Sequence, residues 1–227
     1  MAATPDIWYL ERVRLFRSIS PAELPRFIKD AKRLKLEGRR SVWLDISQGC
    51  VGVIVSGALK LTTVVESGDR SLDAFLEAGD VFGRIGDAVE GLPIETIEPV
   101  ELLYVDGDAL RRWMREQPEF AYEVVQTIGQ AERSVRRRMH QLLCRDVRAR
   151  VVETLVQLAR EYPEACQHGF AVDVRVTQQD IADLVGAARQ VVNRVLRELT
   201  LEMYLERRGR VLCILDLERL AALAEST

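Results

Sequence analysis

The spacing of apolar residues changes near residue 107 of this chain, and this change most constrains what the chain can fold into. Before it, short runs such as Val51, Val53 and Val55 alternate apolar and polar positions, and glycines separate the runs. Such alternation is typical of half-buried antiparallel strands joined by turns. After it, apolar residues recur every three or four positions, which is typical of helices. The sequence therefore predicts an α+β fold.

The alternating segment predicts an antiparallel β-barrel or β-roll of about eight strands over residues 35–106, after a short helix over residues 21–31. The further alternating runs are Val42, Leu44 and Ile46; Leu59, Leu61 and Thr63; Leu72, Ala74 and Leu76; and Leu102 and Tyr104. The glycines that separate the runs are Gly49, Gly57, Gly68 and Gly79.

A long helix is predicted after a short one over residues 109–116 that stops at Pro118. Its apolar positions form a seam with coiled-coil spacing: Val124, Ile128, Ala131, Val135 and Leu142. One interpretation is a single amphipathic helix packed on its own β-domain. We favour a two-stranded dimer seam, because the other flank is too charged to bury, with Arg133, Arg136, Arg137 and Arg138. Arg138 occupies the seam position between Val135 and Leu142, where Met139 could substitute.

The last third of the chain restarts as a separate helical domain. Asp146 is a candidate N-cap for a helix over residues 147–160, which a loop over 162–169 and a short strand over 171–176 follow. We therefore expect a sensor-like β-roll domain over residues 1–118, a dimerisation helix over 119–145 and a DNA-binding domain over 146–227.

Residues 176–203 have the pattern of a helix-turn-helix motif. Thr177 and Asp180 resemble a capping box at the start of a short helix, Gly186 predicts a turn, and a second helix is expected over residues 188–203. The exposed front of that second helix carries Arg189, Gln190, Asn193, Arg194 and Arg197.

Those side chains suit the reading of a DNA major groove. Arginine pairs with guanine, and glutamine or asparagine pairs with adenine, so we expect base contacts from Arg189, Gln190, Asn193 and Arg194. Residues 205–215 read as strand, basic tip and strand, which predicts a wing able to touch phosphates. The side chains expected on the DNA backbone are Thr177, Gln178, Gln179, Arg197, Arg207, Arg208 and Arg210. The alternative is a solvated helix with pairs such as Arg194 with Glu198.

The charge supports this interpretation only locally. The whole chain has 32 basic and 35 acidic residues, a formal charge of −3, which excludes a polycationic protein. Residues 186–210, however, hold six arginines and three glutamates. Only four basic residues are lysines and 28 are arginines, a bias that phosphate recognition or a GC-rich genome would explain equally well.

Several classes of site and of protein are disfavoured. The four cysteines are single, with no C-x-x-C pair and no histidine at zinc-finger spacing, so we expect no metal site, and an iron–sulfur cluster is not supported. No hydrolase, phosphate-loop or metalloprotease motif appears, so we expect no enzyme. No run of 18 apolar residues and no secretory signal occurs, so we expect a cytoplasmic protein that does not bind membranes.

Over about residues 15–220 the chain resembles the CRP/FNR family of bacterial transcription regulators. The residues that carry the resemblance are 175–186 (Arg-Val-Thr-Gln-Gln-Asp-Ile-Ala-Asp-Leu-Val-Gly) and 189–199 (Arg-Gln-Val-Val-Asn-Arg-Val-Leu-Arg-Glu-Leu), with support from the turn at 79–83. The resemblance implies a cyclic-nucleotide-binding-like β-roll, a dimerising helix and a winged helix-turn-helix. It also implies a homodimer that binds a pseudo-palindromic double-stranded DNA site and acts with RNA polymerase.

Some positions depart from the family pattern in the DNA-binding region. Arg189 and Arg194 match the family's base-reading arginines, but Gln190 stands where a glutamate is common. Ala188 replaces the usual serine cap, and Met203 with Tyr204 occupies a turn where a glycine is usual.

The expected effector pocket is degenerate. In cyclic-nucleotide binders of this family, a Gly-Glu-Leu turn holds the ribose, whereas here the residues are Gly83, Arg84 and Ile85. The downstream segment has Glu95 and no arginine for the phosphate, and Val135 and Arg136 replace the adenine-contacting pair. We therefore expect no usual response to cAMP.

Three alternatives remain for the signal and the function. Cys50 could serve as a redox thiol or a haem ligand, although no cofactor is predicted. The regulator could instead need no ligand, with Arg84 paired to Asp87, to Glu95 or to a group on the long helix. The third alternative is an interaction module that keeps the fold without binding DNA.

Overall fold

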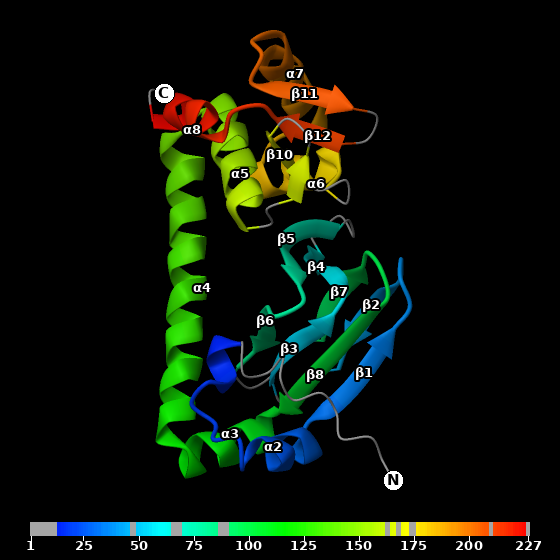
Figure 1. Cartoon of the computed structure of the whole chain (residues 1–227), viewed down its shortest axis with the longest axis vertical. Coiled ribbons are helices and arrows are strands. Elements are labelled where there is room, and N and C mark those ends of the chain that lie inside the picture. The colour runs from blue at the N-terminus through cyan, green and yellow to red at the C-terminus, as the bar shows by residue number, and fades with distance from the viewer. Residues whose placement is uncertain are drawn as a thin grey trace. The chain divides into compact units, whose positions relative to one another are not determined.

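The chain forms two units, Met1–Arg133 and Ser134–Thr227, which meet inside the long helix α4 (Pro118–Cys144) (Figure 1). The computed structural model describes residues 13–45, 49–64, 70–85, 91–161, 164–166, 169–172, 176–208 and 211–225. The sequence placed domain borders at both ends of this helix. The structure divides it instead, because its first half packs on the β-strands and its second half contacts the helical unit.

The first unit contains two antiparallel four-stranded sheets, and the predicted α+β class with an N-terminal β-roll is confirmed. One sheet has the order β1-β8-β3-β6 and the other β2-β7-β4-β5. The strands are β1 (Lys32–Leu36), β2 (Ser41–Leu44), β3 (Cys50–Ser56), β4 (Ala58–Val64), β5 (Arg70–Glu77), β6 (Val81–Arg84), β7 (Leu92–Thr96) and β8 (Val100–Asp106). The predicted positions Ile46 and Gly68 lie outside the described residues.

Strands β3 and β8 are buried on both faces. In β3, Ile54 packs between the two sheets, whereas Val51 and Val53 point to the opposite side, towards the helices. In β8, Leu102 packs between the two sheets, and Leu103 points to the opposite side, towards the helices. Alternate side chains on a strand point to opposite faces, so these two strands need apolar residues at nearly every position.

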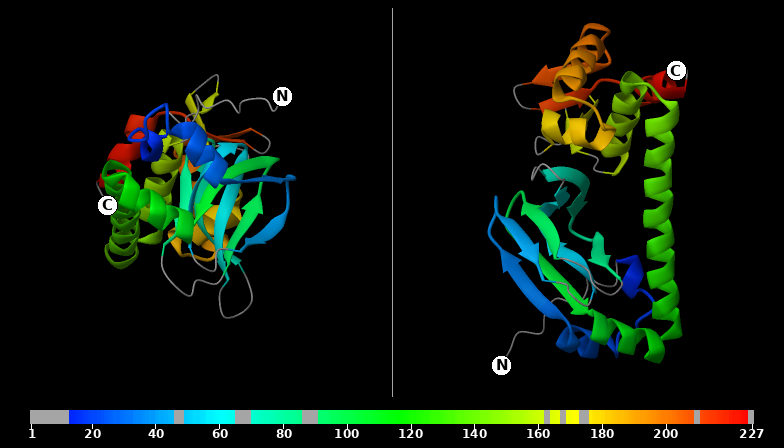
Figure 2. Two further views of the ribbon diagram at one scale, coloured as in Figure 1. Left: turned by 90° about the horizontal axis from the view of Figure 1, so that it is seen from below. Right: turned by 180° about the vertical axis from the view of Figure 1, so that it is seen from behind.

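Helices cover the outer face of the β1-β8-β3-β6 sheet at one end of the first unit (Figures 1 and 2). They are η1 (Arg14–Phe16), α2 (Leu24–Asp30), α3 (Gly107–Glu116) and the first turns of α4. The ring of Phe27 lies 5.3 Å from that of Trp113 and 6.0 Å from that of Phe120, both edge to face. The buried Trp113 indole donates to Asp30 at 3.0 Å, so its polar group is satisfied.

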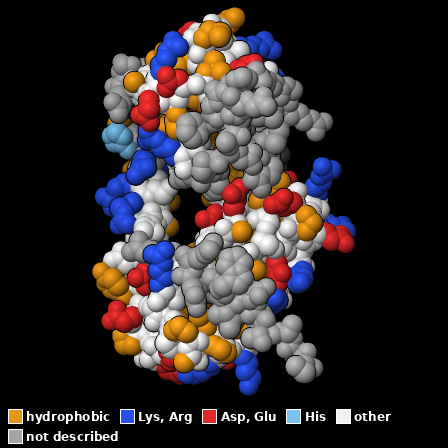
Figure 3. All heavy atoms as spheres, viewed as in Figure 1, with side chains coloured by type: hydrophobic (Ala, Val, Ile, Leu, Met, Phe, Trp, Pro, Cys, Tyr) orange, Lys and Arg blue, Asp and Glu red, His pale blue; other side chains and the backbone are white. Residues whose placement is uncertain are grey.

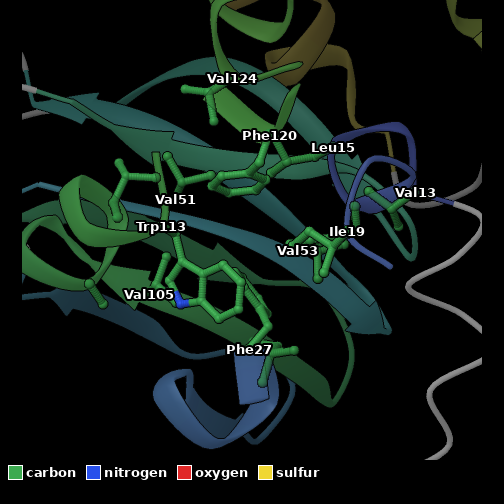
Figure 4. Packing of buried hydrophobic residues seen from close by; sticks show 14 of the residues in the cluster. Val13, Leu15, Ile19, Phe27, Val51, Val53, Val105, Trp113, Phe120 and Val124 are labelled. Atoms are coloured by element: carbon green, nitrogen blue, oxygen red, sulfur yellow. The ribbon is translucent and has the colours of Figure 1, made fainter. Parts of the chain in front are cut away.

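Val124 belongs to this core rather than to an exposed seam. It is buried and clusters with Phe120, Leu15 and Val51 in the first unit (Figure 4). Val124 therefore does not belong to the predicted dimer seam. Spacing alone could not distinguish the two surfaces, because the stripe that packs on the β-roll continues into the stripe that faces solvent.

The second unit holds α5 (Val147–Glu161), α6 (Gln178–Val185), α7 (Arg189–Leu201) and α8 (Leu217–Glu225) beside a sheet of order β11-β12-β10-β9. Asp146 caps α5 as predicted, with its Oδ1 accepting from the Ala149 N–H at 2.7 Å. The strands are β9 (Glu164–Cys166), β10 (Gly169–Val172), β11 (Leu205–Arg208) and β12 (Val211–Ile214). The expected loop over 162–169 is wrong in part, because β9 pairs with β10 there.

The C-terminus of α7 has a conformation that favours glycine, yet it carries a methionine. Met203 has φ +60°, and its N–H donates to the Thr200 carbonyl at 3.2 Å, while the Tyr204 N–H donates to the Leu199 carbonyl at 3.0 Å. These two bonds form a Schellman motif, in which a left-handed residue ends the helix. The departure from the usual glycine therefore leaves backbone strain at Met203.

We predict that Met203→Gly stabilises the second unit by about 1 kcal/mol, because glycine adopts positive φ without a Cβ clash. Thermal unfolding of the full chain should show a higher midpoint. Leu201→Gly, two residues earlier and also exposed to solvent, is the matched control. It should lower the midpoint, because its position is helical. A lower midpoint for Met203→Gly would contradict the assignment of strain.

Candidate nucleic-acid interface

Helix α6 begins with the predicted capping box. The Thr177 hydroxyl accepts from the Asp180 N–H at 3.1 Å, and the Asp180 carboxylate accepts from the Thr177 N–H at 2.7 Å. Each side chain thus satisfies a backbone N–H that the helix leaves unpaired. The cap fixes where α6 starts and hence where its exposed first turn lies.

A tight turn at Gly186 separates α6 from α7. Gly186 has φ +60° and ends α6, as predicted, and a Cβ there would lie 2.8 Å from Leu142 Cδ2 of α4. Arg138, also of α4, donates to the Asp183 carbonyl at 2.8 Å. Arg138 therefore does not occupy a seam position. It points instead to the C-terminus of α6, where a cation is favourable.

Helix α7 is divided into a buried and an exposed face. Val192, Val195, Leu196 and Leu199 are buried. On the opposite side Arg189, Gln190, Arg194 and Arg197 are exposed and Asn193 is half-buried. The five polar side chains predicted to face DNA thus lie on one surface. Ala188 precedes the helix without a side-chain cap.

One ion-pair network includes Arg194, one of the exposed arginines of α7. Arg194 lies 3.9 Å from Glu198 on the same helix and keeps 72% of its side chain exposed. Arg148 of α5 approaches Glu198 more closely, at 3.3 Å, and lies 2.6 Å from Glu202. Sequence analysis did not identify Arg148, although the i,i+4 spacing of the two glutamates indicates a shared cation.

The first turn of α6 carries three further residues expected on the DNA backbone. Thr177 and Gln179 are exposed and Gln178 is half-buried. The Gln179 amide donates to the Asp183 carboxylate at 2.8 Å, four residues later.

The predicted wing is an antiparallel hairpin. Strand β11 pairs with β12 from Leu205 opposite Ile214 to Arg208 opposite Val211. Leu205 and Ile214 are buried and anchor its base, while Arg207 is exposed near its tip. Arg210 and the side chain of Arg208 lie outside the described residues.

The residues expected at the effector pocket are divided between the two units. In the first unit, Gly83 and Arg84 end β6, and Gly83 opposes Val51 while Arg84 opposes Cys50 on β3. A Cβ at Gly83 would lie 2.2 Å from the Cys50 carbonyl, and its φ is +148°. Arg84 and Ile85 are exposed, and Glu95 is half-buried in β7.

No ion pair joins Arg84 to any residue that the structure describes, so pairing of Arg84 with Glu95 is not observed. Asp87, another proposed partner of Arg84, lies outside the described residues. Val135 and Arg136, which stand where the family's cAMP receptors are expected to contact adenine, are exposed on the part of α4 that belongs to the second unit.

Cys50 has the environment of a core residue. Only 1% of its surface is exposed, and it clusters with Ile54, Phe82 and Leu102 between the sheets. Burial raises the pKa of its thiol to about 11, against a smaller lowering by the hydrogen bond to the Arg84 backbone. A protonated, buried thiol is a poor nucleophile and a poor metal ligand. Cys144, by contrast, is exposed.

Within the described parts of the chain, no cluster of three or more His, Cys, Asp or Glu side chains could hold a metal ion. None of the helices described has both the length and the apolar character needed to cross a bilayer.

Comparison with known proteins agrees with this geometry. Residues 149–223 match the model of the Crp-like helix-turn-helix domain. The chain is 28% identical over 218 residues to the CRP-like cAMP-activated global transcriptional regulator of Mycobacterium tuberculosis, covering 93% of this chain and 96% of that protein. It is 27% identical over 191 residues to the global nitrogen regulator of Synechococcus elongatus, covering 82% and 84% of the two chains.

Solved structures share the fold. FixK2 from Bradyrhizobium japonicum superposes with a TM-score of 0.73 at 22% identity, over 85% of this chain and 96% of that one. The regulator CLP from Xanthomonas campestris gives a TM-score of 0.72 at 21% identity, over 87% of this chain and 100% of that one. The chain thus contains a Crp-like helix-turn-helix domain, and over most of its length it is similar to CRP-like transcription regulators.

Proposed function

We propose that the chain acts as a homodimer that reads a pseudo-palindromic DNA site, without the usual response to cAMP. The observation that carries this proposal is the division of α7, in which the apolar face is buried and the arginine-bearing face is left to solvent. A major groove admits such a helix, and its front side chains meet base edges. The resemblance to the CRP/FNR family extends the proposal to a cytoplasmic protein that acts with RNA polymerase.

The proposed base contacts follow from the chemistry of each side chain. Arg189 and Arg194 would each donate two hydrogen bonds to guanine O6 and N7. Gln190 and Asn193 would pair with adenine, and the amide of Gln190 can also donate, unlike a glutamate at that position. The backbone contacts would come from the start of α6, from Arg197 and from the wing, namely Thr177, Gln178, Gln179, Arg207, Arg208 and Arg210.

The proposed dimer rests on the apolar stripe along α4. Ile128, Val135 and Leu142 expose 49%, 69% and 43% of their surface, and Ala131 is exposed beside them. Val125, Met139 and Leu143 are also exposed and extend the stripe. Of these, sequence analysis named only Met139, as a substitute at the seam position of Arg138. Arginines flank the stripe along the helix, as charged residues border a coiled-coil seam. Figure 3 shows basic side chains gathered on this helix.

Indifference to cAMP rests on the side chains at the expected pocket. The exposed guanidinium of Arg84 stands where the family's cyclic-nucleotide binders place a carboxylate for the ribose hydroxyl. Glu95 adds a negative charge where the phosphate would need a cation. The relative from Mycobacterium tuberculosis is described as cAMP-activated, so overall similarity alone does not decide this point.

Selection of bound duplexes from a random-sequence pool by the purified full-length chain tests the proposal. We expect an enriched two-fold-related site whose half-sites lie about one helical turn apart. Failure to retain any duplex, even at low salt concentration, would favour the alternative of an interaction module.

We predict that Arg194→Ala weakens binding to the selected duplex by about 1–3 kcal/mol and abolishes discrimination at one base pair of each half-site. Competition with single-base variants of the duplex measures this effect. Arg197→Ala is the control on the same helix, and it should weaken all sequences alike. Unchanged discrimination in Arg194→Ala would exclude this residue as a base reader.

We predict that Val135→Glu raises the dimer dissociation constant about 100-fold or more, because each dimer would bury two unpaired carboxylates. Sedimentation velocity over a concentration series measures the change. Ser134→Glu introduces the same charge at the neighbouring exposed position, off the apolar stripe, and should leave the dimer intact. A dimer that persists in Val135→Glu would place the interface elsewhere.

We predict that cAMP at millimolar concentration changes the affinity for the selected duplex less than twofold, since a cation faces the ribose position and no cation is offered to the phosphate. Fluorescence anisotropy with and without cAMP provides the measurement. The cAMP-activated relative from Mycobacterium tuberculosis, assayed on its own site, is the positive control. Tightening of the complex by cAMP would show that another arrangement of residues binds the nucleotide.

A further inference from the structure

Arg148 of α5 contacts two acidic residues of another element, one in the last turns of α7 and one at its C-cap. It lies in the first turn of α5, and its two terminal nitrogens reach separate carboxylates, Glu198 at 3.3 Å and Glu202 at 2.6 Å. Only 26% of the Arg148 side chain is exposed, so solvent screens these contacts less than it screens an open surface pair.

Glu198 has two possible cationic partners. Arg148 lies 3.3 Å away, and Arg194, one turn earlier on α7, lies 3.9 Å away. Arg194 is the more exposed of the two arginines, and its contact with Glu198 is at the limit of an ion pair. The shorter, less exposed contact is the stronger one, so Glu198 is held mainly by Arg148.

The two glutamates that Arg148 contacts lie on the same side of α7 as Arg194. Arg194, Glu198 and Glu202 follow one another at intervals of four residues, so all three lie on one side of the helix. Without Arg148, the two glutamates would be uncompensated like charges, and the only cation within one turn of Glu198 on this side would be Arg194. A carboxylate that pairs with Arg194 competes directly with a guanine for the same donors.

We infer that Arg148 is a positioning residue for DNA reading: by binding Glu198 and Glu202 it leaves the Arg194 guanidinium free to reach a base. This inference rests on the proposed role of Arg194. Arg148 itself needs no contact with DNA, and its effect reaches the groove through Glu198 alone.

The test compares full-length variants on the duplex selected by the wild-type chain. Arg148→Met removes the cation and keeps most of the aliphatic stem. We expect roughly three- to tenfold weaker binding, because part of a bidentate base contact is lost. Discrimination should fall at the same base pair that Arg194→Ala relaxes.

The double variant Arg148→Met with Glu198→Gln separates positioning from anchoring. With the competing carboxylate removed, Arg194 should again be free, and both affinity and base discrimination should return to within about twofold of the wild-type values. If Arg148 only anchors α7 to α5, the second substitution restores nothing, and the inference fails.

Two controls account for net charge. Arg160→Met, at the other end of α5, removes the same charge but lies away from α7, and should leave base discrimination unchanged. The double variant Arg148→Met with Glu218→Gln restores the net charge at a remote exposed glutamate and should stay as weak as Arg148→Met. Rescue by Glu218→Gln would reduce the effect to long-range charge and overturn the inference.

Arg148→Lys covers the case in which Arg148→Met does not fold. A lysine keeps the charge but cannot bridge two carboxylates with a planar fork, so we expect a smaller loss that Glu198→Gln again repairs. Arg194→Ala, run in parallel, keeps the two claims apart. If it retains base discrimination, the proposed reading role fails. If it loses discrimination while Glu198→Gln rescues neither Arg148 variant, only the inference about Arg148 fails.

Discussion

The burial of one face of α7 is the constraint on which the DNA-reading surface depends. Val192, Val195, Leu196 and Leu199 pack inside the second unit, and a helix with one face fixed in this way has no freedom to rotate about its axis. The residues on the other side of the helix, including Arg189 and Arg194, must then face outward. The exposed arginines are therefore held by apolar packing, and the capping box and Gly186 set where the two helices begin and end.

Local signals predicted this part of the chain well. The Thr177 and Asp180 cap, the turn at Gly186 and the N-cap at Asp146 each depend on residues within four positions of one another, and each is present in the structure. The alternation of β3 and β8 also predicted strands. It did not predict that both faces would be buried, because the second layer comes from helices distant in the sequence.

Non-local contacts account for what sequence analysis missed. Val124 has seam spacing but packs on the β-roll, and Arg138 has seam spacing but donates to Asp183, 45 residues later. Arg148 meets Glu198 across 50 residues, so no local pattern on α5 could reveal it. Met203 was recognisable as a departure from glycine, but its left-handed conformation was visible only in the backbone angles.

The double burial of β3 and β8 has a consequence for how the first unit opens. A strand covered by a second sheet on one side and by aromatic helices on the other exposes its amides to solvent only when both layers separate. In hydrogen–deuterium exchange these amides would be the last of the unit to lose protection, and they would do so together. Strands β3 and β8 thus form the rigid centre of the β-roll. Their slow cooperative opening sets how long the folded first unit persists.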